Sequence, residues 1–269
     1  MRRRRFLASS LAASAFAGVL PSSGATTLGA EPGDASREYY ELRKYHLRRG
    51  PQQQTIDDFF RDAAIPAMNR LGIKPVGVFT TSIGPGSPAL YVVAPYPSIE
   101  SAVMIHDRVA ADEEYLKAAA TYMNAPAAAP SYMRMETFLL AAFEGMPKLE
   151  APPGAAENQP RIFELRTYES HSRKAGRTKM GMFNRAEIAI FRRTGLRPVF
   201  FGETMVGSGM PSLTYMLTFA NMEERTRAWA AFGSDPEWKT LSAKPGLTDP
   251  EIVSNISNVI LSPTAYSQI

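Results

Sequence analysis

Apolar and polar residues alternate between Tyr39 and Leu47, which is the period of a β-strand with one covered face. Strand-like and helix-like spacings then follow each other in a regular order. They predict a helix over 55–71, a hairpin of strands at 75–83 and 90–94, helical segments that start at 98 and 112, and a strand at 133–143. Pro66 lies inside the first helix and predicts a kink or an interruption there. This order, β-α-β-β-α-β, is the ferredoxin-like arrangement.

The same pattern returns in the second half of the chain. The segment ELRKY at 41–45 reappears as ELRTY at 164–168, and the offset of 123 residues also relates Gly72 to Gly195 without a gap. A register held over such a length indicates two copies of one module in tandem. For the second copy we predict strands at 161–168, 197–205, 213–219 and 253–261, a helix over 178–194, and helices that start at Asn221 and Asp235.

A module of this order places both helices on one face of its sheet and leaves the other face bare. Two copies in one chain can cover both bare faces by turning them towards each other. We therefore expect an α+β fold in which two tandem ferredoxin-like modules pack sheet to sheet as an intramolecular barrel. If Tyr40 and Leu42 pack on the helices, then Glu41, Arg43 and Tyr45 line the space between the sheets.

The repeat and the composition between its copies set the domain organisation. The segment between the two copies is rich in Pro, Gly and Ala, which is typical of a linker. The predicted organisation is an export signal with its lead-in over 1–30, a first module over 37–144, a linker over 145–160, and a second module over 161–269.

The N-terminus has the composition of an export signal. Arg2–Arg5 precede a short apolar run that ends near Leu20, and residues 23–25 form a small-x-small cleavage site. Adjacent arginines followed by Phe-Leu favour the twin-arginine type of signal over an ordinary secretory leader. We therefore expect a bacterial protein that is periplasmic or secreted.

Charge and cysteine content exclude several functions. The formal net charge of +4 equals the four arginines of the leader, so the rest of the chain is formally neutral and has no basic footprint for nucleic acid. The chain contains no cysteine, which excludes disulfides, thiolate metal sites and a cysteine nucleophile. No later apolar run has the length of roughly 20 residues that a membrane span needs, so we expect no stable membrane insertion once the leader is removed.

Conventional catalytic and metal-binding motifs are missing from the sequence. His46, His106 and His171 have no ligand spacing and no duplicated partner, so we expect no metal site. The sequence also contains no Walker loop, dinucleotide fingerprint or nucleophile elbow, and we expect no cofactor. The distinctive DPEW segment at 235–238 is explained by a helix cap and a buried indole.

The repeated Glu-x-Arg-x-Tyr strand is the strongest candidate for a ligand site. Side chains two residues apart on one strand face lie about 7 Å apart, so the Glu and the Arg can form an ion pair that fixes the sheet register. Alternatively, the two arginines hold an anionic or carbonyl group of a ligand against aromatic walls. The candidate pocket wall consists of Glu41, Arg43, Tyr45, Glu164, Arg166 and Tyr168.

Each copy resembles the NIPSNAP domain. The resemblance rests on the opening Tyr/Phe-Glu-Leu-Arg-x-Tyr strand, a helix that ends in glycine, a glycine turn, and the DPEW element of the second copy, which DEEY at 112–115 replaces in the first copy. It implies the dimeric α+β barrel fold. It implies no activity and no catalytic residue, because the family is linked mainly to vesicle, mitochondrial and scaffold roles in animals.

These observations lead to three functional hypotheses. The first is an exported, non-enzymatic protein that binds a small ligand or a partner at the interface of its two modules. The second, by analogy of fold alone, is a cofactor-free monooxygenase or a haem-handling enzyme. A purely structural role is favoured if side chains fill the interior of the barrel. Further homo-oligomerisation is compatible with all three.

Overall fold

The computed structural model describes residues 37–155, 157 and 159–269, so the predicted leader lies outside the described residues. The first copy contains strands β1 (Tyr39–His46), β2 (Gly77–Ile83), β3 (Ala89–Tyr96) and β4 (Arg134–Ala142), with helices α1 (Pro51–Phe59), α2 (Ile65–Arg70), α3 (Ile99–Val103), α4 (Ile105–Ala110), α5 (Glu113–Ala118) and α6 (Ala120–Met123). The second contains β5 (Ile162–Glu169), β6 (Arg197–Val206), β7 (Ser212–Phe219) and β8 (Asn255–Pro263), with α7 (Arg173–Met182), α8 (Ile188–Arg193), α9 (Met222–Ser234), α10 (Pro236–Ser242) and α11 (Asp249–Ile252).

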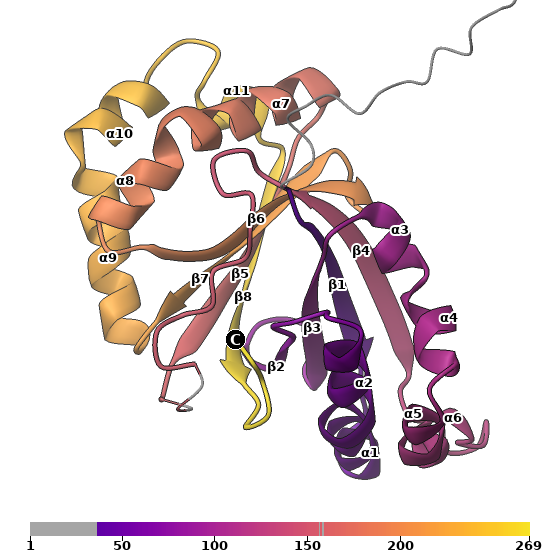
Figure 1. Cartoon of the computed structure of the whole chain (residues 1–269). Helices are drawn as coiled ribbons and strands as arrows, with labels where there is room; N and C mark the ends of the chain where they lie inside the picture. The colour runs from indigo at the N-terminus through magenta and orange to yellow at the C-terminus, as the bar shows by residue number, and fades with distance from the viewer. Residues whose placement is uncertain (1–36, 156, 158) are drawn as a thin grey trace, which may run out of the picture. The chain divides into compact units, whose positions relative to one another are not determined.

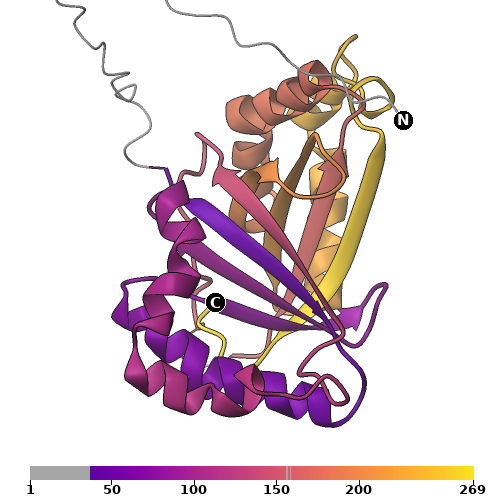
Figure 2. The same cartoon turned by 90° about the vertical axis from the view of Figure 1, so that its right-hand side faces the viewer.

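The eight strands form one closed antiparallel barrel in the order β1-β3-β2-β8-β5-β7-β6-β4 (Figures 1 and 2). Each copy contributes four neighbouring strands, with its first strand between its third and fourth, as the ferredoxin-like order requires. The copies are joined at two places, where β2 pairs with β8 and β4 pairs with β6. The predicted α+β fold, with two tandem modules packed sheet to sheet as an intramolecular barrel, is confirmed.

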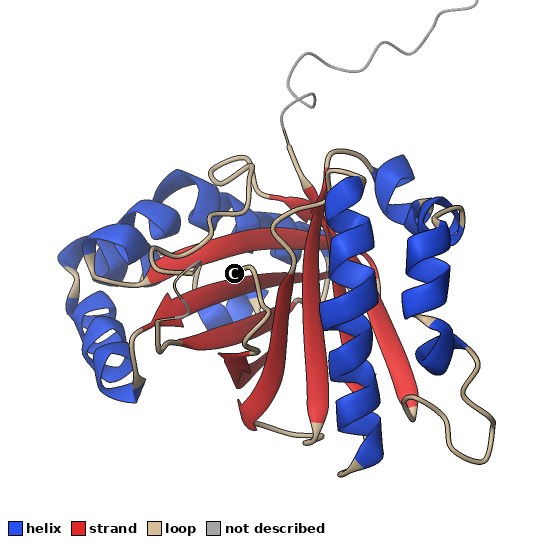
Figure 3. Ribbon diagram, turned by 60° about the horizontal axis from the view of Figure 1, so that its bottom comes forward, coloured by secondary structure: helices blue, strands red, loops and turns tan. Residues whose placement is uncertain are grey.

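The helices of each copy cover the outer face of that copy's own strands (Figure 3). In the first copy, Tyr45 of β1 packs with Phe60 and the helices in a common core. In the second copy, Tyr168 of β5 packs with Phe183 in the equivalent place. These two cores lie outside the barrel and hold the helices on the sheet.

A third core fills the interior of the barrel and draws side chains from both copies. Tyr40, Leu42, Phe163 and Leu165 are buried there, and the rings of Phe163 and Phe79 meet at 4.8 Å between centroids. The predicted orientation of the first strand of each module is therefore wrong. The apolar positions face the shared interior, and the Glu-x-Arg-x-Tyr positions face the helices.

The long first helix of each copy contains one wider turn of π type. It spans Phe60–Ala64 in the first copy and Phe183–Glu187 in the second, at the offset of the repeat. The interruption predicted at Pro66 is thus present, but the second copy forms the same turn with Ala189 at the equivalent position. The proline is therefore not the cause, and the wider turn belongs to the module itself.

Helix α7 starts at Arg173, five residues before the predicted Thr178. Its cap is Ser172, whose hydroxyl accepts a hydrogen bond from the backbone N–H of Ala175. The first turn of α7 is basic and lacks an apolar stripe, so periodicity could not reveal it. Among the described helices, none has both the length and the apolar character that crossing a bilayer requires.

Candidate functional site

In the first copy, two of the predicted site residues, Glu41 and Arg43, form a buried ion pair beneath the helices. The Nε and Nη2 atoms of Arg43 donate to the two carboxylate oxygens of Glu41 at 2.6 and 2.7 Å. The hydroxyl of Tyr96 donates to the same carboxylate at 3.1 Å, and Nε2 of His106 lies 3.3 Å from Nη2 of Arg43. This geometry matches the ion pair that was one of the two interpretations of the motif.

In the second copy, Glu164 is fully buried and accepts five hydrogen bonds. Arg225 donates two of them, at 2.7 and 2.8 Å, and Arg166, Trp229 and Asn258 donate the others at 2.8–3.0 Å. Burial by itself raises the pKa of Glu164, but these hydrogen bonds and the charge of Arg166 outweigh burial and hold the pKa below its ordinary value. The carboxylate thereby connects β5, β8 and α9.

Tyr168 connects this network to a cavity. Its hydroxyl accepts hydrogen bonds from Arg166 at 3.3 Å and from Tyr215 at 3.2 Å. The guanidinium of Arg166 lies 4.7 Å from the ring centroid of Trp229 and 5.5 Å from that of Tyr168. Tyr168 also lines a cavity of about 400 Å³ beside α7. Ligand binding by the six predicted residues stays a prediction.

A buried Lys179–Glu187 pair lies on the other side of Tyr168, and the sequence analysis missed it. The ammonium of Lys179 donates to Glu187 at 3.1 Å and to Asp249 at 3.2 Å, and it lies 5.3 Å from the ring centroid of Trp238. Burial raises the pKa of Glu187 to about 7, although the charge of Lys179 opposes this. The one available signal was the position of both residues on the buried face of the predicted helix.

The pair distinguishes the two copies. At the offset of the repeat, the first copy carries Ile56 and Ala64, and both are buried. Burying a charged pair carries a desolvation cost, so an apolar pair at the same position can stabilise the fold as much as the ion pair does. The module therefore does not need the Lys179–Glu187 pair for its fold.

A cavity of about 280 Å³ opens at one end of the barrel, between the two copies. We call it the barrel mouth. Its lining residues come from strands of both copies and from both hairpin turns: Leu42, Lys44, Pro85, Tyr91, Glu136, Phe138, Leu165, Thr167, Glu169, Ser208, Gly209, Thr214, Ser257, Asn258 and Val259. Leu42, Leu165 and Val259 also belong to the interior core, so the mouth has an apolar floor.

Charged groups surround the barrel mouth above this floor. The ammonium of Lys44 lies 5.5 Å from the ring centroid of Tyr91 and forms no ion pair within the described part of the chain. Glu136 lies 2.6 Å from Nε2 of His46, and Glu169 accepts a hydrogen bond from Asn255 at 3.0 Å. Burial raises the pKa of Glu136, but the contact with His46 and the neighbouring cations outweigh it and lower the pKa. Lys44 is thus the cation that lines the mouth, its charge also acts on Glu136, and with Glu136 and Glu169 the lining carries a formal net charge of −1.

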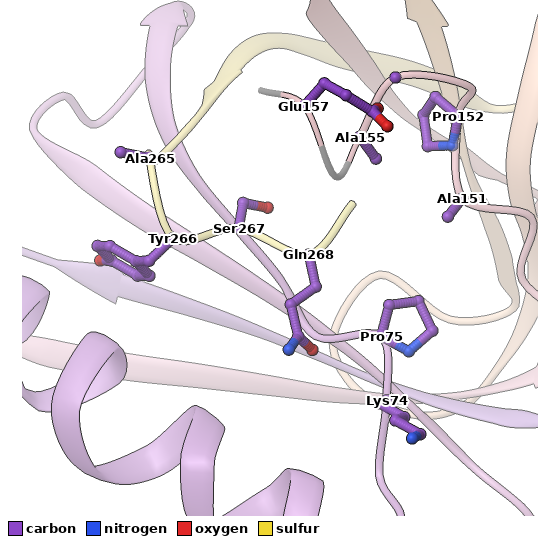
Figure 4. Close-up of a pocket in the computed structure, with 11 residues that line it drawn as sticks. Lys74, Pro75, Ala151, Pro152, Ala155, Glu157, Ala265, Tyr266, Ser267 and Gln268 are labelled. Atoms are coloured by element: carbon purple, nitrogen blue, oxygen red, sulfur yellow. The ribbon is translucent and has the colours of Figure 1, made fainter. Parts of the chain in front are cut away.

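The opposite end of the barrel is closed by the last residues of the described chain. Ile269 is fully buried in the interior core, and a Cβ added at Gly77 would lie 2.7 Å from the ring of Phe79 and 2.8 Å from the side chain of Ile269, so these side chains would have to shift. Outside this plug, the linker and the segment 265–268 enclose a wider, open cavity of about 690 Å³ next to Pro75 (Figure 4). The barrel mouth is therefore separated from this cavity by the filled interior.

Sequence reasoning missed the barrel mouth because it assigned the strand faces the wrong way round. Lys44 and Thr167 follow Leu42 and Leu165 by two residues, so they share the interior face with them. Once the interior face of β1 is known, the sequence places the charged residue Lys44 on that face near the end of the strand. Within the described residues, no group of three or more His, Asp or Glu side chains is placed to hold a metal ion.

The family follows from comparison with known proteins. The family model described as NIPSNAP matches residues 40–143 and 163–268, one stretch in each copy and together more than half of the chain. The chain belongs to the NIPSNAP family. This NIPSNAP protein carries two family domains in tandem, as the repeat predicts. Comparison with curated proteins finds no match.

Solved structures similar to this NIPSNAP protein include a family member and two candidate monooxygenases. A NIPSNAP-like domain protein from Burkholderia xenovorans is 26% identical over 40% of this chain and 90% of that chain, with a TM-score of 0.37. A candidate monooxygenase from Lactobacillus acidophilus is 8% identical over 84% of this chain and 94% of that chain, with a TM-score of 0.55. A second candidate monooxygenase, from Fusobacterium nucleatum, is 8% identical over 85% and 93%, with a TM-score of 0.51. At such identities, the two candidate monooxygenases support the fold alone.

Proposed function

We propose that this NIPSNAP protein binds a small organic acid at the barrel mouth, between its two copies. The observation that carries the proposal is the Lys44 ammonium, which lines the cavity and acts on Glu136 without a direct ion pair in the described part of the chain. A carboxylate placed there gains a charge-assisted hydrogen bond away from bulk water. Convergent polar groups over an apolar floor are typical of small-molecule sites.

The shape of the mouth limits the ligand. Its volume of about 280 Å³ suits a compact molecule. Leu42, Leu165 and Phe138 offer an apolar surface to the body of the ligand, while the carboxylates of Glu136 and Glu169 can accept hydrogen bonds from hydroxyl or amino groups. The proposed ligand is therefore a short-chain or monocyclic carboxylic acid, and further donor groups on it would increase the affinity.

Replacing Lys44 with methionine is expected to weaken the binding of such an acid by about tenfold to a hundredfold, because one charge-assisted hydrogen bond is worth roughly 1.5–3 kcal/mol. Isothermal titration calorimetry with hexanoate and benzoate measures the loss, and hexanamide and benzamide serve as uncharged comparators. Lys117→Met removes an equal charge from the exposed face of α5 and is expected to leave the affinity unchanged.

Three results would overturn this proposal. They are the absence of saturable binding of either acid to the unmodified protein, equal affinity for acid and amide, and unchanged affinity in Lys44→Met. Equal loss of affinity in Lys117→Met would point to general charge attraction instead of a site.

One observation favours an enzyme as a second candidate. Glu136 lines the barrel mouth and lies 2.6 Å from Nε2 of His46, and Arg134 contacts both groups, so a carboxylate orients an imidazole next to the lining of the mouth, as in a positioned base. A cofactor-free monooxygenase needs a group that removes a proton from its substrate. If the protein is such an enzyme, it should consume oxygen with a quinol-like substrate, and His46→Gln should slow consumption at least about a hundredfold. A protein that consumes none with such substrates is not this enzyme.

A further inference from the structure

The fold forms a cavity at the same place in each copy, between the first helix and the hairpin of the second and third strands. We call the one in the second copy the α7 cavity. It has a volume of about 400 Å³ and is lined by Arg37, Tyr168, Ser170, Arg173, Gly176, Arg177, Met180, Glu203, Thr204, Met205, Met210, Pro211, Ser212 and Leu213. It lies on the helix-covered outer face of the sheet, and so it is separate from the barrel mouth.

Its counterpart in the first copy has a volume of about 240 Å³. The two cavities correspond residue by residue at the offset of the repeat, for example Leu47 with Ser170, Gln53 with Gly176, Asp57 with Met180, Thr81 with Thr204, and Pro88 with Pro211. The position of the α7 cavity is therefore a property of the module. Its larger size and its lining are specific to the second copy.

The α7 cavity is basic. Arg173 and Arg177 lie one turn apart on the same face of α7, and neither forms an ion pair within the described residues. Their equivalents in the first copy are Gly50 and Gln54. With Arg37 and Glu203 included, the charged side chains that line the cavity carry a formal net charge of +2. The counterpart cavity contains Asp57 and no arginine.

Neutral groups complete the lining. Tyr168, Ser170 and Ser212 line the sheet side, where the Tyr168 hydroxyl accepts from Arg166 and Tyr215 and the Ser212 hydroxyl donates to Thr204 at 2.9 Å. Gly176 gives the cavity its depth, because a Cβ there would already contact Pro211 and Ser170 at 3.7 Å. Three methionines, Met180, Met205 and Met210, form an adaptable apolar wall. The cavity thus combines paired guanidinium groups, hydroxyl groups and an apolar surface.

We propose that the α7 cavity binds a phosphate monoester with an apolar organic part. Guanidinium groups bind phosphate oxygens with paired hydrogen bonds, and two of them match a group whose charge at neutral pH is about −2. The hydroxyl of Ser170, which lies next to Gly176, supplies a further hydrogen bond to a phosphate oxygen, and the methionine wall covers the organic part. The first copy does not share this site, because its counterpart cavity lacks both arginines.

The test uses phenyl phosphate as the probe, with inorganic phosphate and phenol as comparators, in isothermal titration calorimetry. The unmodified protein is expected to bind one phenyl phosphate, and to bind it at least tenfold more tightly than either comparator. The double variant Arg173→Gln with Arg177→Gln is expected to lose at least about a hundredfold in affinity. Gly176→Leu, which keeps both arginines and fills the cavity, is expected to lose binding as well.

A matched control separates the cavity from the basic surface around it. Lys174 and Arg185 share a surface hollow with Arg173 and Arg177 on the outside of the same helical segment, but neither lines the α7 cavity. Lys174→Gln with Arg185→Gln therefore removes the same charge outside the cavity and should leave affinity unchanged. Equal loss in this control would overturn the proposal in favour of a surface for polyanions. Binding that survives Gly176→Leu, or no saturable binding at all, would also overturn it. Lys44→Met should bind phenyl phosphate normally, so the two proposed sites can fail independently.

Discussion

Replacing Glu164 with alanine is expected to lower the free energy of unfolding by about 3–5 kcal/mol, the usual cost of removing one partner from a buried ionic network. The loss is large because Arg166 and Arg225, whose side chains are 15% and 21% exposed, keep their charges while losing their acceptor. Trp229 and Asn258 lose a hydrogen bond at the same time. Urea denaturation followed by circular dichroism measures the change.

The control for this variant is Glu223→Ala on α9. Glu223 pairs with Arg227 at 2.9 Å, but both side chains are more than two-thirds exposed, so the change should stay within about 0.5 kcal/mol. Similar effects of the two substitutions would show that the Glu164 network contributes little.

The low pKa of Glu164 also gives the expected pH dependence. Because the folded state holds the pKa of Glu164 below its unfolded value, the contribution of the ionised carboxylate to stability is complete above the unfolded pKa of about 4.3. It is lost as the pH falls through the folded pKa. The stability difference between the unmodified protein and Glu164→Ala should therefore shrink below about pH 4.

Replacing Phe163 with alanine is expected to lower the free energy of unfolding by about 3–5 kcal/mol. Both copies should unfold in one common transition, which moves to a lower temperature. Phe163 is fully buried inside the barrel and contacts Phe79 of the other copy. Removing the ring leaves a void that the surrounding strands of a closed barrel cannot easily collapse. Differential scanning calorimetry measures both the shift and the number of transitions.

Leu116→Ala serves as the control, because Leu116 is 40% exposed on α5 and its truncation should change stability by less than about 1 kcal/mol. A thermogram of Phe163→Ala with two separate transitions, of which only one has moved, would contradict a shared interior. In that case the two copies would unfold as independent units.

The repeat allowed most of the fold to be predicted. The offset between Glu41 and Glu164 also separates the two wide turns from each other and the two glycine turns from each other. The fold predicted for one module therefore applies to the other. The barrel then followed from the need to cover two bare sheet faces. The alternation of apolar and polar residues does not show which face of β1 packs against the helices, because both faces of this strand are buried.

The orientation was wrong for a physical reason that Glu41 and Glu164 illustrate. A charged residue usually indicates an open or solvated face, but both carboxylates are buried against the helices with all-internal hydrogen bonds. Their partners Tyr96, Arg225 and Trp229 come from strands and helices far along the chain. Spacing along one strand carries no information about such partners.

The same limit explains why the α7 cavity and the barrel mouth were not predicted. Arg173 and Lys44 appear in the sequence as ordinary surface charges, and each belongs to a cavity only through the closure of the barrel or the packing of α7. The repeat nevertheless contained a usable signal. Positions that differ between the copies at otherwise equivalent places, such as Lys179 and Ile56, mark the region where the two copies are specialised differently.

The two pairings that close the barrel, β2 with β8 and β4 with β6, also affect how copies of this protein can meet. Each of its eight described strands has a neighbour on both sides, although parts of some strands pair on one side only, such as Arg134–Phe138 of β4, which pairs with β1 alone. A second chain therefore finds no strand with a whole edge free to pair with. We therefore expect copies of this protein to meet through helices or loops, because the closed barrel presents only short stretches of strand for pairing.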